Sequence, residues 1–295
     1  MQLKFTKMHG AGNDFVVINA MLQDVNAFTA ADWQYLGNRQ YGVGADQILL
    51  VERPTIAHAD FKYTIYNQDG SMVENCGNGA RCFVKYVHEK GLSDKAEITV
   101  QIATGTMVLK LNSDGSVTVN MGAPKFNPAD LPCLTQGLAT QIQGQATLYG
   151  VSVANETHWL SLVSMGNPHA VQTVADVDAA PVLVEGAQLD THEIFPKKAN
   201  IGFMQIINPH HIKVRIFERG AGETLACGTG ACAAVVAGIE RGVLRSPVRV
   251  SARGGELHIA WEGAQNDVLM TGPAVTVFEG QIDLPAPQNE MQQKQ

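Results

Sequence analysis

One short pattern occurs twice in the sequence, about half a chain apart, and this repetition restricts the possible folds more than any other feature. A cysteine followed by Gly-X-Gly-Ala stands at positions 76–80 and again at 227–231. After each copy comes a helix-length apolar stretch that ends in a basic residue and a glycine, Gly91 in the first case and Gly242 in the second. Each glycine lies 15 residues beyond its cysteine, where a left-handed residue would close a helix.

The correspondence continues on both sides of the two cysteines, in the same order. A Gly-Asn pair at 12–13 lies 63 residues before the first cysteine, and another at 166–167 lies 60 residues before the second. Asn67 and Glu218 each stand nine positions ahead of their cysteine. Two more matches follow downstream, Thr104-Gly105 with Gly254-Gly255 and Met121-Gly122-Ala123-Pro124 with Thr271-Gly272-Pro273-Ala274. These matches indicate two homologous halves, the product of a domain duplication and not a solenoid of short repeats.

We expect residues 1–126 together with 275–295 to form one half and residues 127–274 to form the other. Each half contains short runs of β-branched or aromatic residues bounded by Gly, Asp or Asn, which are typical of strands. The expected strands are 15–18, 47–51, 61–66, 97–102, 107–111, 116–121, 159–163, 201–206, 212–217, 248–251 and 257–261. The helix after the second cysteine is apolar on every side and must therefore be enclosed, by the strands of its own half. The fold class is α+β.

The composition excludes several classes of function. A net charge of -7 argues against a nucleic-acid partner held through its phosphates. No apolar stretch reaches the length of a membrane span, and the N-terminus lacks the apolar core and cleavage site of a signal peptide. Five cysteines without a targeting signal favour a reducing cytoplasm over a disulfide framework. The Pro- and Gln-rich residues 285–295 are expected to form a frayed tail.

Two cysteines at equivalent positions predict a reaction that uses two proton-transfer groups. Inverting an amino acid at Cα without a cofactor requires a base on one face and an acid on the other. Thiol and thiolate suit both roles, and a helix N-terminus is expected to lower the pKa of its cysteine. The glycine-opened helix starts would also bind the substrate carboxylate as it gains charge. We therefore expect Cys76 and Cys227 to flank one cleft as acid and base.

Other interpretations of the cysteines remain open from the residues alone. A buried cysteine is often only a small apolar residue, and we interpret Cys82, Cys133 and Cys232 in this way. A thiol protease is a second possibility, although it would not need the repeated cysteine. A metal site is a third, but no Cys-x-x-Cys or His pair has ligand spacing, and adjacent His210 and His211 would point to opposite sides of a strand. We expect no metal.

Five longer motifs resemble those of the diaminopimelate epimerase family. They are KMHGAGNDF at 7–15, NCGNGARC at 75–82, MGNPH at 165–169, ERGAGET at 218–224 and ACGTGAC at 226–232. The resemblance spans nearly the whole chain and is weakest between Phe126 and Glu156 and in the last ten residues. It implies the interconversion of LL- and meso-diaminopimelate, in the synthesis of lysine and peptidoglycan precursors, without pyridoxal phosphate or metal.

The resemblance also implies roles for single residues. Cys76 and Cys227 would be the acid/base pair, and His169 and Glu218 would support the geometry of catalysis. The residues expected to bind the substrate are Asn13, Gln47, Asn67, Gly77, Asn78, Asn167, Asn200, Glu218, Arg219, Gly228 and Thr229. Because the substrate has two amino-acid ends, Arg219 suits its distal carboxylate through a bidentate pair of hydrogen bonds.

The implied fold has two β-barrel-like domains, each wrapped around a central helix, with the last strand returning to the first domain. The family also implies a homodimer, in which Phe278 takes a contact position usually held by tyrosine. Proline and hydroxyproline racemases are the alternative within this fold, although such relatives carry a histidine where Asn78 stands and lack the 218–223 motif. A non-catalytic amino-acid-binding protein is an alternative of another class, but binding alone would need neither cysteine.

Overall fold

The computed structural model describes residues 1–73 and 76–285, which form two compact units. Unit 1 contains residues 1–117 and the chain from 274 onward, and unit 2 contains residues 118–273. Residues 286–295 of the expected tail at 285–295 and the motif residue Asn75 lie outside the described residues. No helix in the described part of the chain combines the length and hydrophobicity needed to cross a bilayer.

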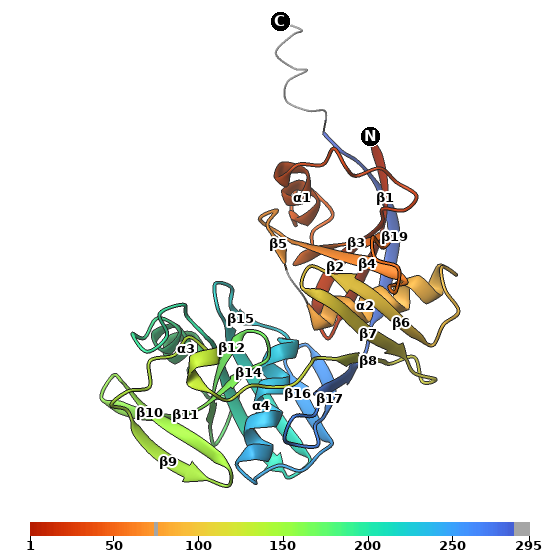
Figure 1. Cartoon of the computed structure of the whole chain (residues 1–295). Coiled ribbons are helices and arrows are strands. Elements are labelled where there is room, and N and C mark those ends of the chain that lie inside the picture. Colours follow the sequence, from red (N-terminus) through yellow and green to blue (C-terminus); the bar gives the residue numbers. More distant parts are fainter. Residues whose placement is uncertain (74–75, 286–295) are drawn as a thin grey trace, which may run out of the picture. The chain divides into compact units, whose positions relative to one another are not determined.

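Unit 1 is a strand-rich unit with two helices among its described residues (Figure 1). Its elements are β1 (Gln2–Gly10), β2 (Asn13–Asn19), α1 (Ala30–Gly37), β3 (Gln47–Glu52), β4 (Phe61–Asn67), β5 (Met72–Val73), α2 (Gly77–Glu89), β6 (Glu97–Ile102), β7 (Gly105–Leu111) and β19 (Val275–Asp283). The last of these, β19, pairs antiparallel with β1, so both ends of the chain contribute to this unit.

Unit 2 repeats this plan with a longer entry segment. Its elements are the short helix η1 (Pro128–Asp130), β9 (Ala139–Gln143), β10 (Ala146–Val153), β11 (Glu156–Ser164), β12 (Pro168–Thr173), α3 (Val182–Asp190), β13 (Asn200–Asn208), β14 (His211–Glu218), β15 (Gly222–Thr224), α4 (Gly228–Glu240), β16 (Val248–Ala252), β17 (Gly255–Ala260) and β18 (Leu269–Gly272). The strand β8 (Val117–Asn120) begins at the boundary between the units.

The same order of strand pairings occurs in both units. In unit 1, β2 is parallel to β3, β3 is antiparallel to β4, and β4 is parallel to β6. In unit 2, β12 is parallel to β13, β13 is antiparallel to β14, and β14 is parallel to β16. The registers agree as well: Gln47 lies opposite Asn67, while Ile201 lies opposite Phe217, which brings Asn200 level with Glu218. Residues at matching positions in the sequence therefore occupy matching positions in the two sheets.

The two cysteine-led helices, α2 and α4, have 13 residues each and lie among strands of their own unit (Figure 1). The helix α2 contacts β1, β2, β3, β7 and β19, and α4 contacts β11 to β14, β16 and β17. Both helices end as the sequence predicted. Gly91 and Gly242 have φ of 62° and 73°, and the residue after each glycine donates its N–H to a carbonyl in the last helical turn, 2.9 Å away in α2 and 3.0 Å in α4.

Two helices were not expected from the sequence. The helix α1 has only eight residues, and Trp33 and Leu36 are buried in the apolar cluster of unit 1 with Leu3, Val16 and Ile48. The helix α3 has nine residues and contributes Val182 and Leu189 to the apolar core of unit 2. Segments this short have little helical stability of their own, because the cost of nucleation is spread over few hydrogen bonds. Packing against the strands therefore determines that both segments are helical.

Several strands were also missing from the sequence-based assignment. The strands β9 and β10 lie in the segment of unit 2 where the resemblance to the family is weakest, and β9 is almost entirely exposed. The strands β15 and β18 are short, with three and four residues. Neither a fully exposed nor a very short strand produces the alternation of apolar and polar residues on which sequence assignment depends.

Candidate active site

In unit 1 the N-cap of helix α2 is Cys76, and the predicted residues gather around it. Gly12, with φ of 86°, turns the chain between β1 and β2 and brings Asn13 to the start of β2. The Oδ1 atom of Asn13 accepts hydrogen bonds from Cys76 Sγ at 3.6 Å and from Asn78 Nδ2 at 3.2 Å. Gly77 and Asn78 form the buried start of the helix. One asparagine oxygen thus joins the thiol to the helix start.

A second pair of predicted residues lies on neighbouring strands of the same unit. Gln47 begins β3 and Asn67 ends β4, and Gln47 Nε2 donates to Asn67 Oδ1 at 3.0 Å. The Oε1 atom of Gln47 is buried and has no hydrogen-bond donor among the described residues. A buried carbonyl oxygen without a donor costs free energy, which a ligand N–H group would recover. Gln47 therefore offers an unused hydrogen-bond acceptor to a ligand.

Two supporting interactions in unit 1 were not anticipated from the sequence. Tyr63 is buried on β4, and its hydroxyl donates to the carbonyl oxygen of Cys76 at 2.9 Å. Asp46 Oδ2 accepts from Asn13 Nδ2 at 3.0 Å and so orients the amide whose oxygen faces the thiol. In the sequence Tyr63 is only one aromatic residue of a strand, and Asp46 only one residue of a turn. Neither position carries a signal that could have identified it.

In unit 2 the N-cap of helix α4 is Cys227, which is 7% exposed. Its Sγ atom accepts a hydrogen bond from the backbone N–H of Gly230 at 3.4 Å and lies 3.5 Å from Thr229 Oγ1. Gly228 is the first residue of the helix and is buried. The predicted residues at this helix start are therefore in contact with the thiol.

A chain of hydrogen bonds connects Cys227 with a buried imidazole. Asn167 Nδ2 donates to Thr229 Oγ1 at 3.3 Å, and Asn167 Oδ1 lies 3.0 Å from His169 Nε2. An amide oxygen only accepts, so this orientation of the amide requires that Nε2 carries the proton of the imidazole. Burial, together with the positive charge of Arg219, lowers the pKa of His169 to about 3. The imidazole is therefore neutral at physiological pH and positions Asn167 as a donor.

The remaining predicted residues of unit 2 lie where β13 and β14 meet. Asn200 Nδ2 donates to the carbonyl oxygen of Pro168 at 3.0 Å, and Asn200 Oδ1 accepts the backbone N–H of Arg219 at 3.0 Å. Glu218 accepts a very short hydrogen bond from the hydroxyl of Thr224. The Arg219 guanidinium is exposed, donates to the carbonyl oxygen of Lys197 at 3.3 Å, and forms no ion pair among the described residues. It is thus free to bind a carboxylate.

The pKa of Cys227 differs from the sequence-based expectation. Burial raises the pKa of the Cys227 thiol well above its ordinary value, and the nearby carboxylate of Glu218 raises it further. The Thr229 hydroxyl and the Gly230 N–H act in the opposite direction but are outweighed. The expected lowering by the helix N-terminus is therefore wrong for Cys227 in this state, and the group is a protonated thiol at neutral pH.

The other cysteines with a shifted pKa are also protonated. Burial raises the pKa of Cys82 to about 12 and that of Cys133 to about 11. None of the five cysteines forms a disulfide. Cys82 and Cys232 are 0% exposed and lie within α2 and α4, which agrees with their interpretation as apolar packing residues.

Comparison with known proteins identifies the family. The family model described as diaminopimelate epimerase matches residues 5–127 and 161–277. A diaminopimelate epimerase of Herminiimonas arsenicoxydans is 59% identical over 284 residues, which cover 96% of this chain and 100% of that protein. One of Cupriavidus taiwanensis is 58% identical over 286 residues, 97% of this chain and 99% of that protein. This chain belongs to the diaminopimelate epimerase family. It is an isomerase of the epimerase type and acts on a small molecule.

Solved structures with low sequence identity share the fold of the family. A hydroxyproline epimerase from Agrobacterium vitis aligns with a TM-score of 0.63 at 15% identity and covers 97% of this chain and 94% of its own. A probable proline racemase from Agrobacterium radiobacter K84 aligns with a TM-score of 0.66 at 17% identity, covering 96% and 93%. The predicted α+β epimerase fold is therefore confirmed.

One segment of the chain lies outside the family model, although the relatives named above align with almost the whole chain. The family model leaves residues 128–160 unmatched, and this segment contains η1, β9, β10 and the start of β11. The sequence motifs were weakest in nearly the same place. The hairpin of β10 and β11 therefore lies largely outside the part of the chain that the family model describes.

Proposed function

We propose that this chain interconverts LL- and meso-diaminopimelate, with Cys76 and Cys227 as the two proton-transfer groups and without pyridoxal phosphate or metal. One observation carries the proposal. Each of two units with the same strand order places a cysteine at the N-cap of an enclosed 13-residue helix. The sulfur contacts a polar side chain of the motifs in both, the amide of Asn13 for Cys76 and the hydroxyl of Thr229 for Cys227. A thiol kept only for packing would need neither the repeated helix start nor these polar partners.

The protonation of Cys227 suggests a division of labour between the thiols. In the state described here Cys227 carries its proton, so it would donate to the α-carbon while the Cys76 thiolate removes the proton from the other face. In the reverse direction the roles exchange, because an acid that has donated its proton becomes the base. The carboxylate of the substrate, which gains charge as the proton leaves, would bind the N–H groups at the starts of α2 and α4.

The distal end of the substrate explains the remaining polar groups. Its carboxylate would bind the guanidinium of Arg219, which has no carboxylate partner among the described residues. Its ammonium, or that of the reacting centre, would donate to the buried Oε1 of Gln47 and to Glu218. A monocarboxylate such as proline would leave Arg219 without a partner. This is why we place diaminopimelate ahead of proline or hydroxyproline, although the fold supports both.

Isotope exchange in reduced protein tests the proposal. The full chain is incubated in D₂O with diaminopimelate and, in parallel, with proline, and deuterium at Cα is followed by mass spectrometry. We expect deuterium in diaminopimelate only, and loss of interconversion in both Cys76→Ser and Cys227→Ser, whereas the matched control Cys82→Ser stays active. Exchange with proline would favour the racemase alternative. Binding of diaminopimelate without exchange would identify a non-catalytic binding protein.

We also propose that the active form is a homodimer in the cytoplasm. Three apolar side chains on β19 are exposed, Val275 by 39%, Val277 by 55% and Phe278 by 48%. Phe278 contacts Phe5 edge to face, with 5.9 Å between the ring centroids, and still leaves apolar area to bury against a second copy. Sedimentation should show a dimer that Phe278→Ser weakens, and a monomeric parent protein would refute this. Five cysteines without a disulfide suit a reducing compartment.

A further inference from the structure

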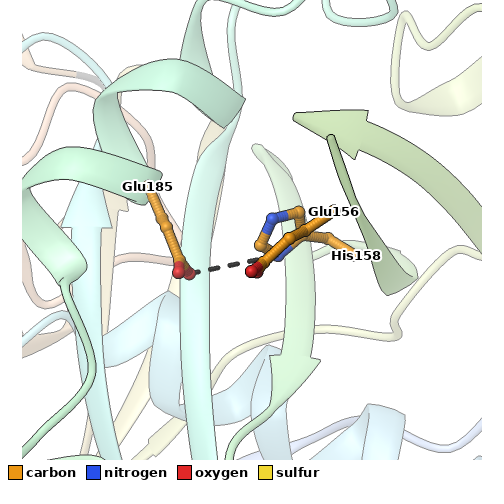
Figure 2. A group of neighbouring side chains, drawn as sticks. All are labelled: Glu156, His158 and Glu185. Carbon is orange, nitrogen blue, oxygen red and sulfur yellow. Dashed lines mark ion pairs between the residues drawn. The ribbon is translucent and has the colours of Figure 1, made fainter. Parts of the chain in front are cut away.

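A second group of polar side chains lies in unit 2, on the hairpin formed by β10 and β11. Ala154 and Asn155 have φ of 52° and 68°, which is the left-handed backbone of a two-residue hairpin turn. Glu156 follows the turn directly, and His158 follows two residues later on the same face of β11. Glu185 reaches them from the first turn of α3, and the three side chains point toward one another (Figure 2).

The distances suit a shared ligand. The carboxylate oxygens and the imidazole nitrogen of Glu156, His158 and Glu185 all lie within 4.8 Å of one another. His158 Nδ1 is 3.9 Å from Glu185 Oε2 and 3.0 Å from Gln172 Oε1, and Gln172 Nε2 donates to Glu185 Oε2 at 3.4 Å. Ligands of a four-coordinate ion at 2.0–2.2 Å stand roughly 3.3 Å apart, so small rotations of all three side chains would complete the site.

The charges in this cluster are not balanced by the protein. Two carboxylates face one imidazole, and neither carboxylate forms an ion pair with a lysine or arginine among the described residues. The side chain of His158 is only 9% exposed and that of Glu185 only 23% exposed, so these two potential ligands are held within the fold while Glu156 is exposed. A hollow of about 320 Å³ is lined in part by His158 and Gln172, and Glu156 is itself exposed to solvent.

We propose that Glu156, His158 and Glu185 bind a divalent cation of borderline softness, with zinc as the representative ion. The mixed nitrogen and oxygen ligands favour such an ion over magnesium or calcium, which prefer oxygen alone. Gln172 Oε1 would accept the Nδ1–H of His158 and so leave the other ring nitrogen, Nε2, for the ion, and water would complete the coordination. Glu156 and His158 lie in the segment that the family model leaves unmatched, and none of the three residues belongs to the predicted substrate site.

The ion would act as a clamp. It would tie the hairpin of β10 and β11 to α3, two elements that are distant in sequence, and so stabilise unit 2 without touching the catalytic thiols. Because metal binds the folded site and not the unfolded chain, zinc should raise the unfolding temperature of unit 2. Magnesium at the same concentration should not.

Calorimetric titration of the full chain with zinc alone tests this site. Cys76→Ser and Cys227→Ser are combined in the background, because thiolates would bind zinc themselves. We expect one ion per chain and an affinity at least tenfold lower in Glu156→Gln, a change at an exposed position that folding tolerates. The matched control Glu193→Gln, at another exposed glutamate of unit 2, should bind like its parent.

His158→Gln provides the second variant, and hydrogen exchange provides a readout independent of titration. Zinc should slow exchange at the hairpin turn and in α3 of the parent but not in His158→Gln. The proposal is overturned if no zinc binds, if Glu156→Gln binds as tightly as the parent, or if magnesium gives the same stabilisation.

Discussion

The buried imidazole of His169 makes the stability of unit 2 depend on pH in a way that can be calculated. His169 is 1% exposed, and burial, with a further contribution from Arg219, lowers its pKa from 6.5 to about 3. In the unfolded chain the same group has its ordinary pKa. Between these two values the unfolded state binds a proton that the folded state does not, so stability falls as the pH falls.

The magnitude follows from the two pKa values. Each pH unit between them costs about 1.4 kcal/mol, so lowering the pH from 7 to 4.5 should remove about 2.5 kcal/mol through His169 alone. The loss begins as the pH passes below 6.5 and would end only near 3, where the folded state also becomes protonated. His169→Gln lacks this proton, so its stability should decline less over the same range, whatever its stability at pH 7.

Urea unfolding followed by tryptophan fluorescence measures this difference. Trp159 and Trp261 belong to unit 2 and Trp33 to unit 1, so a Trp33→Phe background reports on unit 2 alone. The change in the free energy of unfolding between pH 7 and 4.5 is compared for the parent and His169→Gln. Groups that titrate in the same way in both proteins cancel in this comparison. The matched control is His258→Gln, at an exposed position of the same unit, which should follow the parent. Equal losses of stability in the parent and in His169→Gln would refute the assignment of a buried neutral imidazole.

Three further outcomes are expected. Cys82→Ser places a hydroxyl at a site that is 0% exposed and should lower the free energy of unfolding by about 1–3 kcal/mol; unchanged stability in urea would contradict this. Gly79→Ala would bring a Cβ atom 2.4 Å from the hydroxyl of Tyr63 and should cost about 1–3 kcal/mol by thermal unfolding, part of which Tyr63→Phe in the same chain should restore. Burial raises the pKa of Asp14, but hydrogen bonds from Arg39 and a lysine outweigh it and hold that pKa well below its ordinary value. Asp14→Asn should therefore destabilise unit 1 by about 1–3 kcal/mol at neutral pH, with a deficit that shrinks as the pH falls below about 3.8; a deficit that is constant in acid would exclude this linkage.

The duplicated cysteine motifs were sufficient to predict the central architecture. Each motif combines an N-cap, two glycines and an apolar helix that ends in a left-handed glycine, and all of these are local properties of consecutive residues. The helices α2 and α4 begin and end where the motifs indicated. The central strands were also recognisable, since β3 and β13 are long and largely buried. The helices α1 and α3 were not, because their stability comes from packing on the sheets.

In the predicted site, too, one part was identified from the sequence and another part only from the structure. The motifs named the residues, but only the folded units show how they act on one another. Asn13 joins Cys76 to Asn78 through one oxygen, and Asn167 links His169 to Thr229. The assignment of these residues as a substrate site stays a prediction until exchange is measured. Tyr63, which holds the carbonyl of Cys76, carried no sequence signal.

The sequence by itself determined the duplication, the two cysteine-led helices and the family, because these depend on the identity and spacing of neighbouring residues. Tertiary structure decided the protonation states. A helix start alone would acidify Cys227, yet burial and the approach of Glu218, from another strand, raise its pKa. The tertiary structure also brings Glu156 and His158, on the hairpin of β10 and β11, close to Glu185 on α3. Burial and contacts between distant segments set the local dielectric and the nearest charges, and no pattern of consecutive residues contains them.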